Sequence, residues 1–225
     1  FTDAEIGETR ALLVIYRGEI VAERYGEGYG PKTVFLGWSL SKTVTAVAIG
    51  ILVAEGKLRL DESPPITHWQ RTGDARGDIT LRQLLQMRSG LRHTETTQPP
   101  YQANTVRVLF TDGRDDMAAE AEAQPLEAEP GRKFEYSTNN SIILSDVIAR
   151  VLTPRRDPVS RQAEVRHFMH DRLFAPVGLK SMTAEYDAAG TMIGGAMIHA
   201  TARDWGKFGE FLRHSGSVKG AQVVP

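Results

Sequence analysis

The chain has 225 residues, and its 27 Lys and Arg against 28 Asp and Glu give a formal net charge of −1 at pH 7. Hydrophobic residues make up 41% and charged residues 24%, which are ordinary values for a globular protein. This balance gives no electrostatic reason to expect a nucleic-acid partner. The absence of cysteine excludes a disulfide scaffold and is compatible with either a reducing cytoplasm or an exported bacterial protein such as a periplasmic one.

No apolar run reaches the ~18 to 20 residues that cross a bilayer, so no membrane span is expected. The chain starts at Phe1 without a signal-like segment, which indicates that the natural N-terminus, with any targeting signal, precedes it. The length suits one large domain or two small ones with a substantial core, and it leaves the oligomeric state open.

The first predicted element is a β-hairpin. Residues 11–16 form a short apolar run rich in branched side chains, and residues 20–25 form a second strand-like run. Arg17-Gly18-Glu19 between them is typical of a turn. Two such runs around a short connection that contains glycine predict an antiparallel pair.

A buried helix follows over residues 41–55. From Val44 to Ala54 the sequence is apolar on every side apart from Thr45, and Gly56 suits a helix C-terminus. The polar residues of this stretch gather at its N-terminal end. They are Ser39, Ser41, Lys42 and Thr43.

Five further helices are expected from apolar periodicity, composition and capping signals. They cover residues 79–87, 115–124, 140–152, 164–174 and 201–213. The Ala-rich, acidic stretch 115–124 predicts a solvated helix, and Gly194-Gly195 predicts a simple turn. Residues 216–224 are typical of a turn and the start of a strand.

Together these elements predict an α+β fold, in which an antiparallel sheet is flanked by helices and a mostly helical subdomain is inserted. We expect residues 1–56 to supply the hairpin and the central helix, and residues 57–180 to form the helical subdomain. Residues 181–225 would return to the sheet.

Ser39 and Lys42 stand three residues apart at the start of the buried helix and therefore share one of its faces. The electropositive helix N-terminus and burial both favour an uncharged amine on Lys42. Such an amine can act as a general base toward the Ser39 hydroxyl, while the N-terminal amides stabilise an oxyanion. A serine before an apolar helix is also a common N-cap, so the pair alone leaves both interpretations open.

The wider pattern resembles the serine β-lactamase-like hydrolases, in particular the branch that holds class C β-lactamases, D-Ala-D-Ala peptidases and esterases. The segments that carry the resemblance are residues 38–43, 55–61, 79–85 and 89–91, which read WSLSKT, EGKLRLD, ITLRQLL and SGL. Within that branch, residues 37–39 and 201–205 look most like the 6-aminohexanoate-dimer hydrolase group. The resemblance covers nearly the whole chain.

The resemblance implies a β-lactamase/transpeptidase-like fold and a catalytic role for Ser39, Lys42 and Tyr136. Tyr136 would move a proton between the serine and the leaving group. The family often carries Asn at the position of Thr138, so substrate contact is assigned instead to Asn140. Tyr101 would be a loop tyrosine that reaches the cleft, as in the 6-aminohexanoate-dimer hydrolase group, and the alternative is an ordinary surface-loop residue.

The third motif of such enzymes, a Lys-Thr-Gly-like edge strand, does not occur in the chain, and Lys219-Gly220 belongs to a predicted hairpin turn. The resemblance expects further strands and a helix after Pro225. His167 and His170 do not form a zinc motif, so neither a metal nor a cofactor is expected.

We therefore expect a serine hydrolase that forms an acyl-enzyme on Ser39 and hydrolyses a small-molecule amide, ester or β-lactam. The alternative is a non-hydrolytic penicillin-binding or sensing module of the same fold. A third possibility is a helical interaction domain in which the Ser39–Lys42 spacing is accidental.

Overall fold

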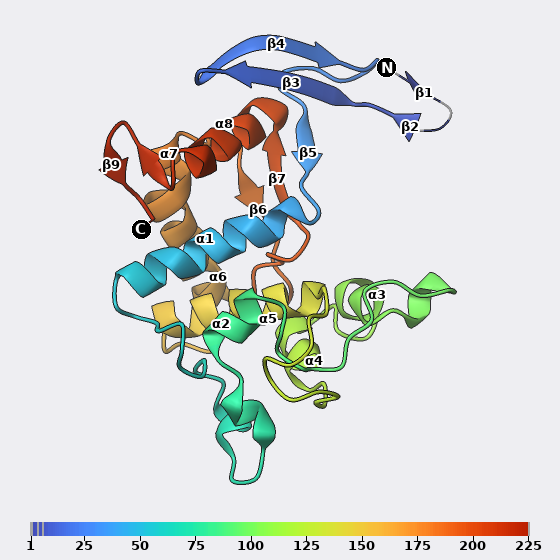
Figure 1. Cartoon of the computed structure of the whole chain (residues 1–225), viewed down its shortest axis with the longest axis vertical. Helices are drawn as coiled ribbons and strands as arrows, with labels where there is room; N and C mark the ends of the chain where they lie inside the picture. The colour runs from blue at the N-terminus through green and yellow to red at the C-terminus, as the bar shows by residue number, and fades with distance from the viewer. Residues whose placement is uncertain (1, 4, 6, 225) are drawn as a thin grey trace.

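The computed structural model of the chain describes residues 2–3, 5 and 7–224. Over these described residues the fold mixes helices with four small antiparallel sheets, which confirms the predicted α+β class. Helix α1 (Leu40–Ala54) lies across the middle of the molecule in Figure 1. The strands and the last two helices (residues 175–177 and 202–213) lie on one side of it, and the helices between residues 81 and 152 lie on the other.

The predicted hairpin is confirmed as strands β3 (Ala11–Tyr16) and β4 (Glu19–Tyr25), which pair antiparallel. Arg17 and Gly18 between them have φ of 52° and 84°. Two consecutive residues with positive φ form the type I′ turn that matches the twist of a two-stranded ribbon. Two shorter strands, β1 (Thr2–Asp3) and β2 (Gly7–Glu8), precede the hairpin.

A three-stranded sheet with the order β5–β7–β6 leads into the central helix. It consists of β5 (Val34–Leu36), β6 (Thr183–Ala184) and β7 (Ile198–Thr201), all paired antiparallel. Because β7 pairs with both of the others, it joins the start of the chain to its C-terminal part.

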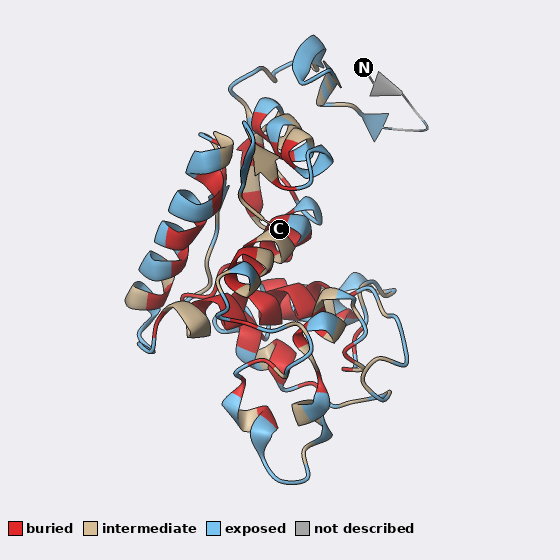
Figure 2. Ribbon diagram, turned by 60° about the vertical axis from the view of Figure 1, so that its left-hand side comes forward, coloured by how far each residue is buried: buried red, intermediate tan, exposed pale blue. Residues whose placement is uncertain are grey.

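Helix α1 is buried along most of its length, as its apolar sequence predicts. Gly56 ends it with φ of 70°, and the amides of Gly56 and Lys57 donate to Val53 and Leu52. These two bonds form a Schellman cap, which favours glycine. Helix α5 (Thr138–Leu152) packs against α1, and Figure 2 shows buried residues concentrated at this centre while the hairpin is largely exposed.

Smaller elements complete the structure. After α1 come η1 (Thr67–Gln70), η2 (Ala75–Asp78), α2 (Leu81–Leu85), η3 (Pro100–Gln102), α3 (Asn104–Phe110) and α4 (Met117–Glu122). After α5 come α6 (Pro158–Met169), the π-helical turn η4 (His170–Phe174), α7 (Ala175–Val177), α8 (Ala202–Arg213), β8 (Ser217–Val218) and β9 (Ala221–Gln222).

Two predicted helices differ from the observed ones. The acidic stretch 115–124 forms α4, but this helix is not solvated, because Met117, Ala121 and Glu122 are buried. The carboxylate of Glu122 lies 3.2 Å from Arg150, so the chain buries this acid beside a cation instead of exposing it. Helix α6 begins at Pro158, six residues before the predicted start.

Within the described residues, no helix is long and apolar enough to cross a membrane.

Candidate active site

Ser39 stands at a strand–turn–helix junction. Strand β5 ends at Leu36, and α1 begins at Leu40. Between them, Gly37 donates its amide to the Ile198 carbonyl at 2.8 Å, and an added Cβ at this glycine would collide with the Trp205 ring. Trp38 has φ of 44°, a left-handed conformation that is strained for a bulky residue. The turn therefore holds Ser39 at the surface end of the central helix.

The hydroxyl of Ser39 does not cap α1. Ser39 has helical φ and ψ of −65° and −12°, and its side chain makes no capping hydrogen bond. Its oxygen instead lies 3.2 Å from Lys42 Nζ, so the predicted contact between the two side chains is present. The serine is exposed, whereas the lysine is only 9% exposed.

Lys42 has unusual partners for a buried lysine. Its Nζ donates to the carbonyl oxygen of Gly195 at 2.7 Å and lies 5.1 Å from the centre of the Tyr136 ring. In the part of the chain that the structure describes, no carboxylate pairs with it. A cation at this place would rely on the Ser39 hydroxyl, a carbonyl and an aromatic face, at the electropositive end of a helix.

Gly194 and Gly195 are more than the simple turn expected from the sequence. The Gly194 carbonyl accepts a hydrogen bond from Thr45 at 2.9 Å, one turn along α1 from Lys42. An added Cβ at Gly195 would lie 2.9 Å from Thr138 Cγ2 and 3.0 Å from its carbonyl oxygen. The two glycines therefore let this segment enter between α1 and α5 and present a carbonyl to the lysine.

Tyr136 lies just before α5 and is 39% exposed. Ser137 caps the helix by accepting a hydrogen bond from the Asn140 amide at 3.1 Å. Tyr136 is thus fixed at a helix start, where its ring comes near Lys42. The fold therefore brings together Ser39, Lys42 and Tyr136, although Ser39 and Tyr136 are 97 residues apart in sequence.

Asn140 and Tyr101, the two predicted substrate contacts, are placed differently. Asn140 is buried; its Oδ1 accepts from Ser89 Oγ at 3.1 Å, and its Nδ2 lies 3.5 Å from the Leu84 carbonyl. These hydrogen bonds hold α5 against the end of α2, and none of them involves Lys42. Tyr101 is 66% exposed in η3. Substrate contact by either residue stays a prediction.

Sequence reasoning missed Glu95, which comes from the loop before η3. One of its carboxylate oxygens accepts from Thr138 Oγ1 at 2.6 Å, and the other accepts from the Thr138 amide at 2.9 Å and lies 2.7 Å from His93 Nε2. Burial opposes the charge of Glu95, but hydrogen bonds from His93 and Thr138 outweigh it and lower the pKa to about 2. No motif marks this residue.

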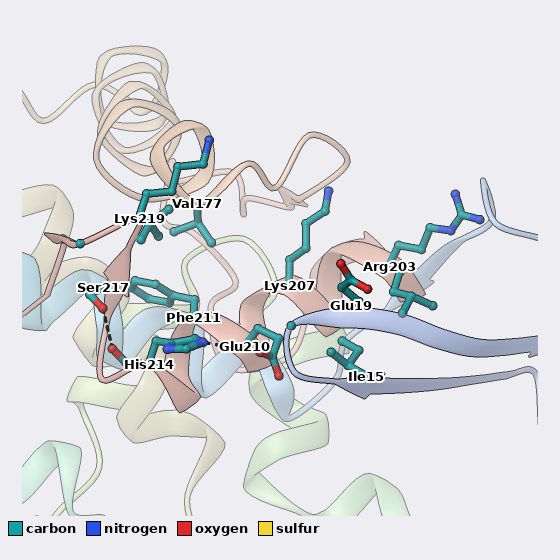
Figure 3. A pocket seen from close by; sticks show the side chains of 14 residues that line it. Ile15, Glu19, Val177, Arg203, Lys207, Glu210, Phe211, His214, Ser217 and Lys219 are labelled. Carbon is teal, nitrogen blue, oxygen red and sulfur yellow. Dashed lines mark hydrogen bonds and ion pairs between the residues drawn. The ribbon is translucent and has the colours of Figure 1, made fainter.

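A cavity of about 690 Å³ lies elsewhere, between the β3–β4 hairpin, α8 and the β8–β9 turn (Figure 3). Its apolar side chains include Ile15, Ile20 and Phe211, and charged residues such as Lys207 and Glu210 also line it. Neither Ser39 nor its partners line this cavity. The hydroxyl of Ser217, which also lines the cavity, donates to the His214 backbone carbonyl at 2.8 Å.

Among the described residues, no group of three His, Asp or Glu side chains could hold a metal ion.

Comparison with known proteins gives independent information on the family of this chain. The family model described as Beta-lactamase matches residues 8–224. The 6-aminohexanoate-dimer hydrolase of Paenarthrobacter ureafaciens is 25% identical over 224 residues, which cover 96% of this chain and 55% of that protein. The chain thus spans about half the length of this curated relative.

Solved structures show the same fold. A Bacillus anthracis protein provisionally named a 6-aminohexanoate-dimer hydrolase matches with a TM-score of 0.78 at 21% identity, over 96% of this chain and 57% of its own. A D-stereospecific amidohydrolase from Streptomyces sp. matches with a TM-score of 0.59 at 23% identity, over 85% of this chain and 64% of its own.

Proposed function

The chain belongs to the beta-lactamase family, and from that premise we propose that it hydrolyses an amide bond through an acyl-enzyme on Ser39. The observation that carries the proposal is the position of Lys42 Nζ between the Ser39 hydroxyl and the Gly195 carbonyl. A neutral amine offers two N–H groups and one lone pair. With one N–H given to Gly195, the lone pair can face the serine.

In the proposed acylation step, the Ser39 oxygen forms a bond to the substrate carbonyl carbon while Lys42 takes the hydroxyl proton. The negative charge moves to the carbonyl oxygen. The Ser39 amide at the start of α1 has no hydrogen-bond acceptor within the described ranges, so it can donate to that oxygen. As the tetrahedral intermediate collapses, the bond to the leaving nitrogen breaks and that nitrogen receives the proton.

Tyr136 is the proposed carrier for this last transfer. Its ring lies beside Lys42, and the residue is 39% exposed, so its hydroxyl is accessible to a leaving group. Deacylation reverses the roles: water loses a proton to the base and attacks the ester carbon, and Ser39 recovers its proton. No step requires a metal or another cofactor.

The amide preference rests on the relatives. Proteins that match over most of this chain include a 6-aminohexanoate-dimer hydrolase and a D-stereospecific amidohydrolase, alongside proteins named as a beta-lactamase and a penicillin-binding protein homologue. Esters and β-lactams undergo the same acyl transfer. Asn140 and Tyr101 remain proposed contributors to substrate contact.

The test is labelling of the protein by a fluorophosphonate probe together with a panel of chromogenic amide and ester substrates. We expect labelling in the wild type, its loss in Ser39→Ala, and sustained product release. A single burst without turnover would favour the penicillin-binding or sensing alternative. Equal labelling of the wild type and Ser39→Ala would overturn the proposal, and Ser217→Ala serves as the matched serine control.

A further inference from the structure

Glu95 accepts hydrogen bonds from the first residue of α5, Thr138, with both of its carboxylate oxygens. Its two oxygens take both donors of Thr138, the amide and the hydroxyl. His93 and Thr105 also reach the carboxylate, at 2.7 Å and 2.9 Å. The Glu95 side chain is only 25% exposed. This arrangement fixes both sides of the contact, the loop and the helix start.

The position of Thr138 determines where two partners of Lys42 lie. Tyr136 precedes Thr138 by two residues, across the Ser137 cap. Thr138 also packs against the backbone of Gly195. The two lie so close that a Cβ added to Gly195 would come within 2.9 Å of Thr138 Cγ2. The Gly195 carbonyl in turn accepts the hydrogen bond of Lys42. A shift of Thr138 would therefore move both the carbonyl and the aromatic ring.

Resting on the proposed acyl-enzyme chemistry, we propose that Glu95 is a positioning residue, which holds Thr138 and thereby sets Tyr136 and the Gly195 carbonyl around Lys42. Glu95 has no contact with Ser39 or Lys42 in the described structure, so it takes no proton from either. It acts because a carboxylate at a helix start satisfies amides that have no intrahelical partner and complements the helix dipole. Small displacements in such sites cost rate more than affinity.

The experiment measures the rate of fluorophosphonate labelling against probe concentration, which separates the maximal rate from the half-saturating concentration. In Glu95→Gln we expect the maximal rate to fall about tenfold or more, while the half-saturating concentration stays within about twofold. Glu129→Gln, an exposed carboxylate that pairs with Arg132, is the matched control and should keep the wild-type rate. An unchanged maximal rate in Glu95→Gln would overturn the inference.

A second pair of variants keeps the test valid if Glu95→Gln fails to fold. Thr138→Val removes the hydroxyl that donates to Glu95, and Thr138→Ser keeps it. We expect Thr138→Val to label several-fold more slowly than Thr138→Ser, and equal rates would contradict the inference.

The double variant Glu95→Gln, Thr138→Val shows whether Glu95 acts through Thr138. If it does, the double variant labels about as slowly as Glu95→Gln alone, because residues in one network are not additive. Rate losses that multiply would mean that the two residues act independently, which would overturn the inference. Absence of Ser39-dependent labelling in the wild type would instead refute the proposed function, so the two failures are distinguishable.

Discussion

At the scale of single residues, Lys42 is the most informative side chain. A buried lysine ordinarily has a carboxylate partner, and here it has a serine hydroxyl, a backbone carbonyl and an aromatic ring. Its contact with Ser39 could be predicted, because a spacing of three residues fixes one helix face. Its contact with Gly195 could not, because the two residues are 153 apart and no motif links them.

Replacement of Lys42 by methionine tests its role. Methionine fills a similar volume but has no group that accepts a proton, so we expect the turnover rate to fall about 10²- to 10⁴-fold. The fold should persist, since the variant buries an apolar chain in place of an amine without an ion-pair partner. Turnover and thermal unfolding are measured together, and a variant that folds and retains a tenth of the activity would contradict the proposed base.

At the scale of elements, the structure shows which sequence patterns are sufficient to predict a helix or a strand. The hairpin, α1, α5 and α8 follow alternation, apolar periodicity and caps, and all were predictable. The seven-residue α3 was not, because it is too short to show a period. The prediction that α4 is exposed to solvent was wrong, because an acidic composition does not reveal that Arg150 lies beside Glu122 in the folded chain.

The contact between α1 and α5 depends on Gly194. A Cβ at this position would collide with Thr45 on α1 and Ser145 on α5. We expect Gly194→Ala to lower the free energy of unfolding by about 1 to 3 kcal/mol, the usual cost of overpacking. Urea denaturation measures it. Gly209→Ala on α8 is the control, because its added Cβ would meet nothing within 4 Å; an equal loss in both variants would refute the explanation.

At the scale of the whole molecule, the larger of two apolar clusters among the described residues draws its buried side chains from the central helix, the helical segment and the C-terminal sheet. The fold class and the family resemblance could therefore be predicted from the sequence. The ion pairs buried in the interior could not. Asp146 lies in contact with both Arg150 and Arg161, and Glu122 lies beside them. Burial and the neighbouring Asp146 raise the pKa of Glu122 to about 9.

This buried acid gives the stability a pH dependence. Because the folded pKa of Glu122 lies above its ordinary value of 4.5, its contribution is fully present below pH 4.5 and is lost as the pH rises toward 9. The slope from one such group cannot exceed about 1.4 kcal/mol per pH unit. Glu95, whose pKa is lowered to about 2, acts oppositely and loses its contribution as the pH falls below its ordinary value.

Glu122→Gln isolates the first effect, since glutamine cannot ionise. We expect the free energy of unfolding of this variant to increase relative to that of the wild type as the pH rises from 5 to 9, because only the wild type loses the Glu122 contribution. Urea denaturation at pH 5, 7 and 9 measures the difference, with Glu129→Gln as the surface control. A difference that is constant over this range would show that Glu122 does not hold its proton in the native state.

The strained turn before the central helix also bears on how this protein can evolve. Trp38 keeps a left-handed backbone that costs ~1 to 3 kcal/mol, and the neighbouring glycine must stay bare to lie against an indole. Variants that relax this bend would gain folding stability, but they would displace Ser39, the proposed nucleophile. Under the proposed chemistry, this junction would therefore keep its strain even though a relaxed sequence would fold more stably.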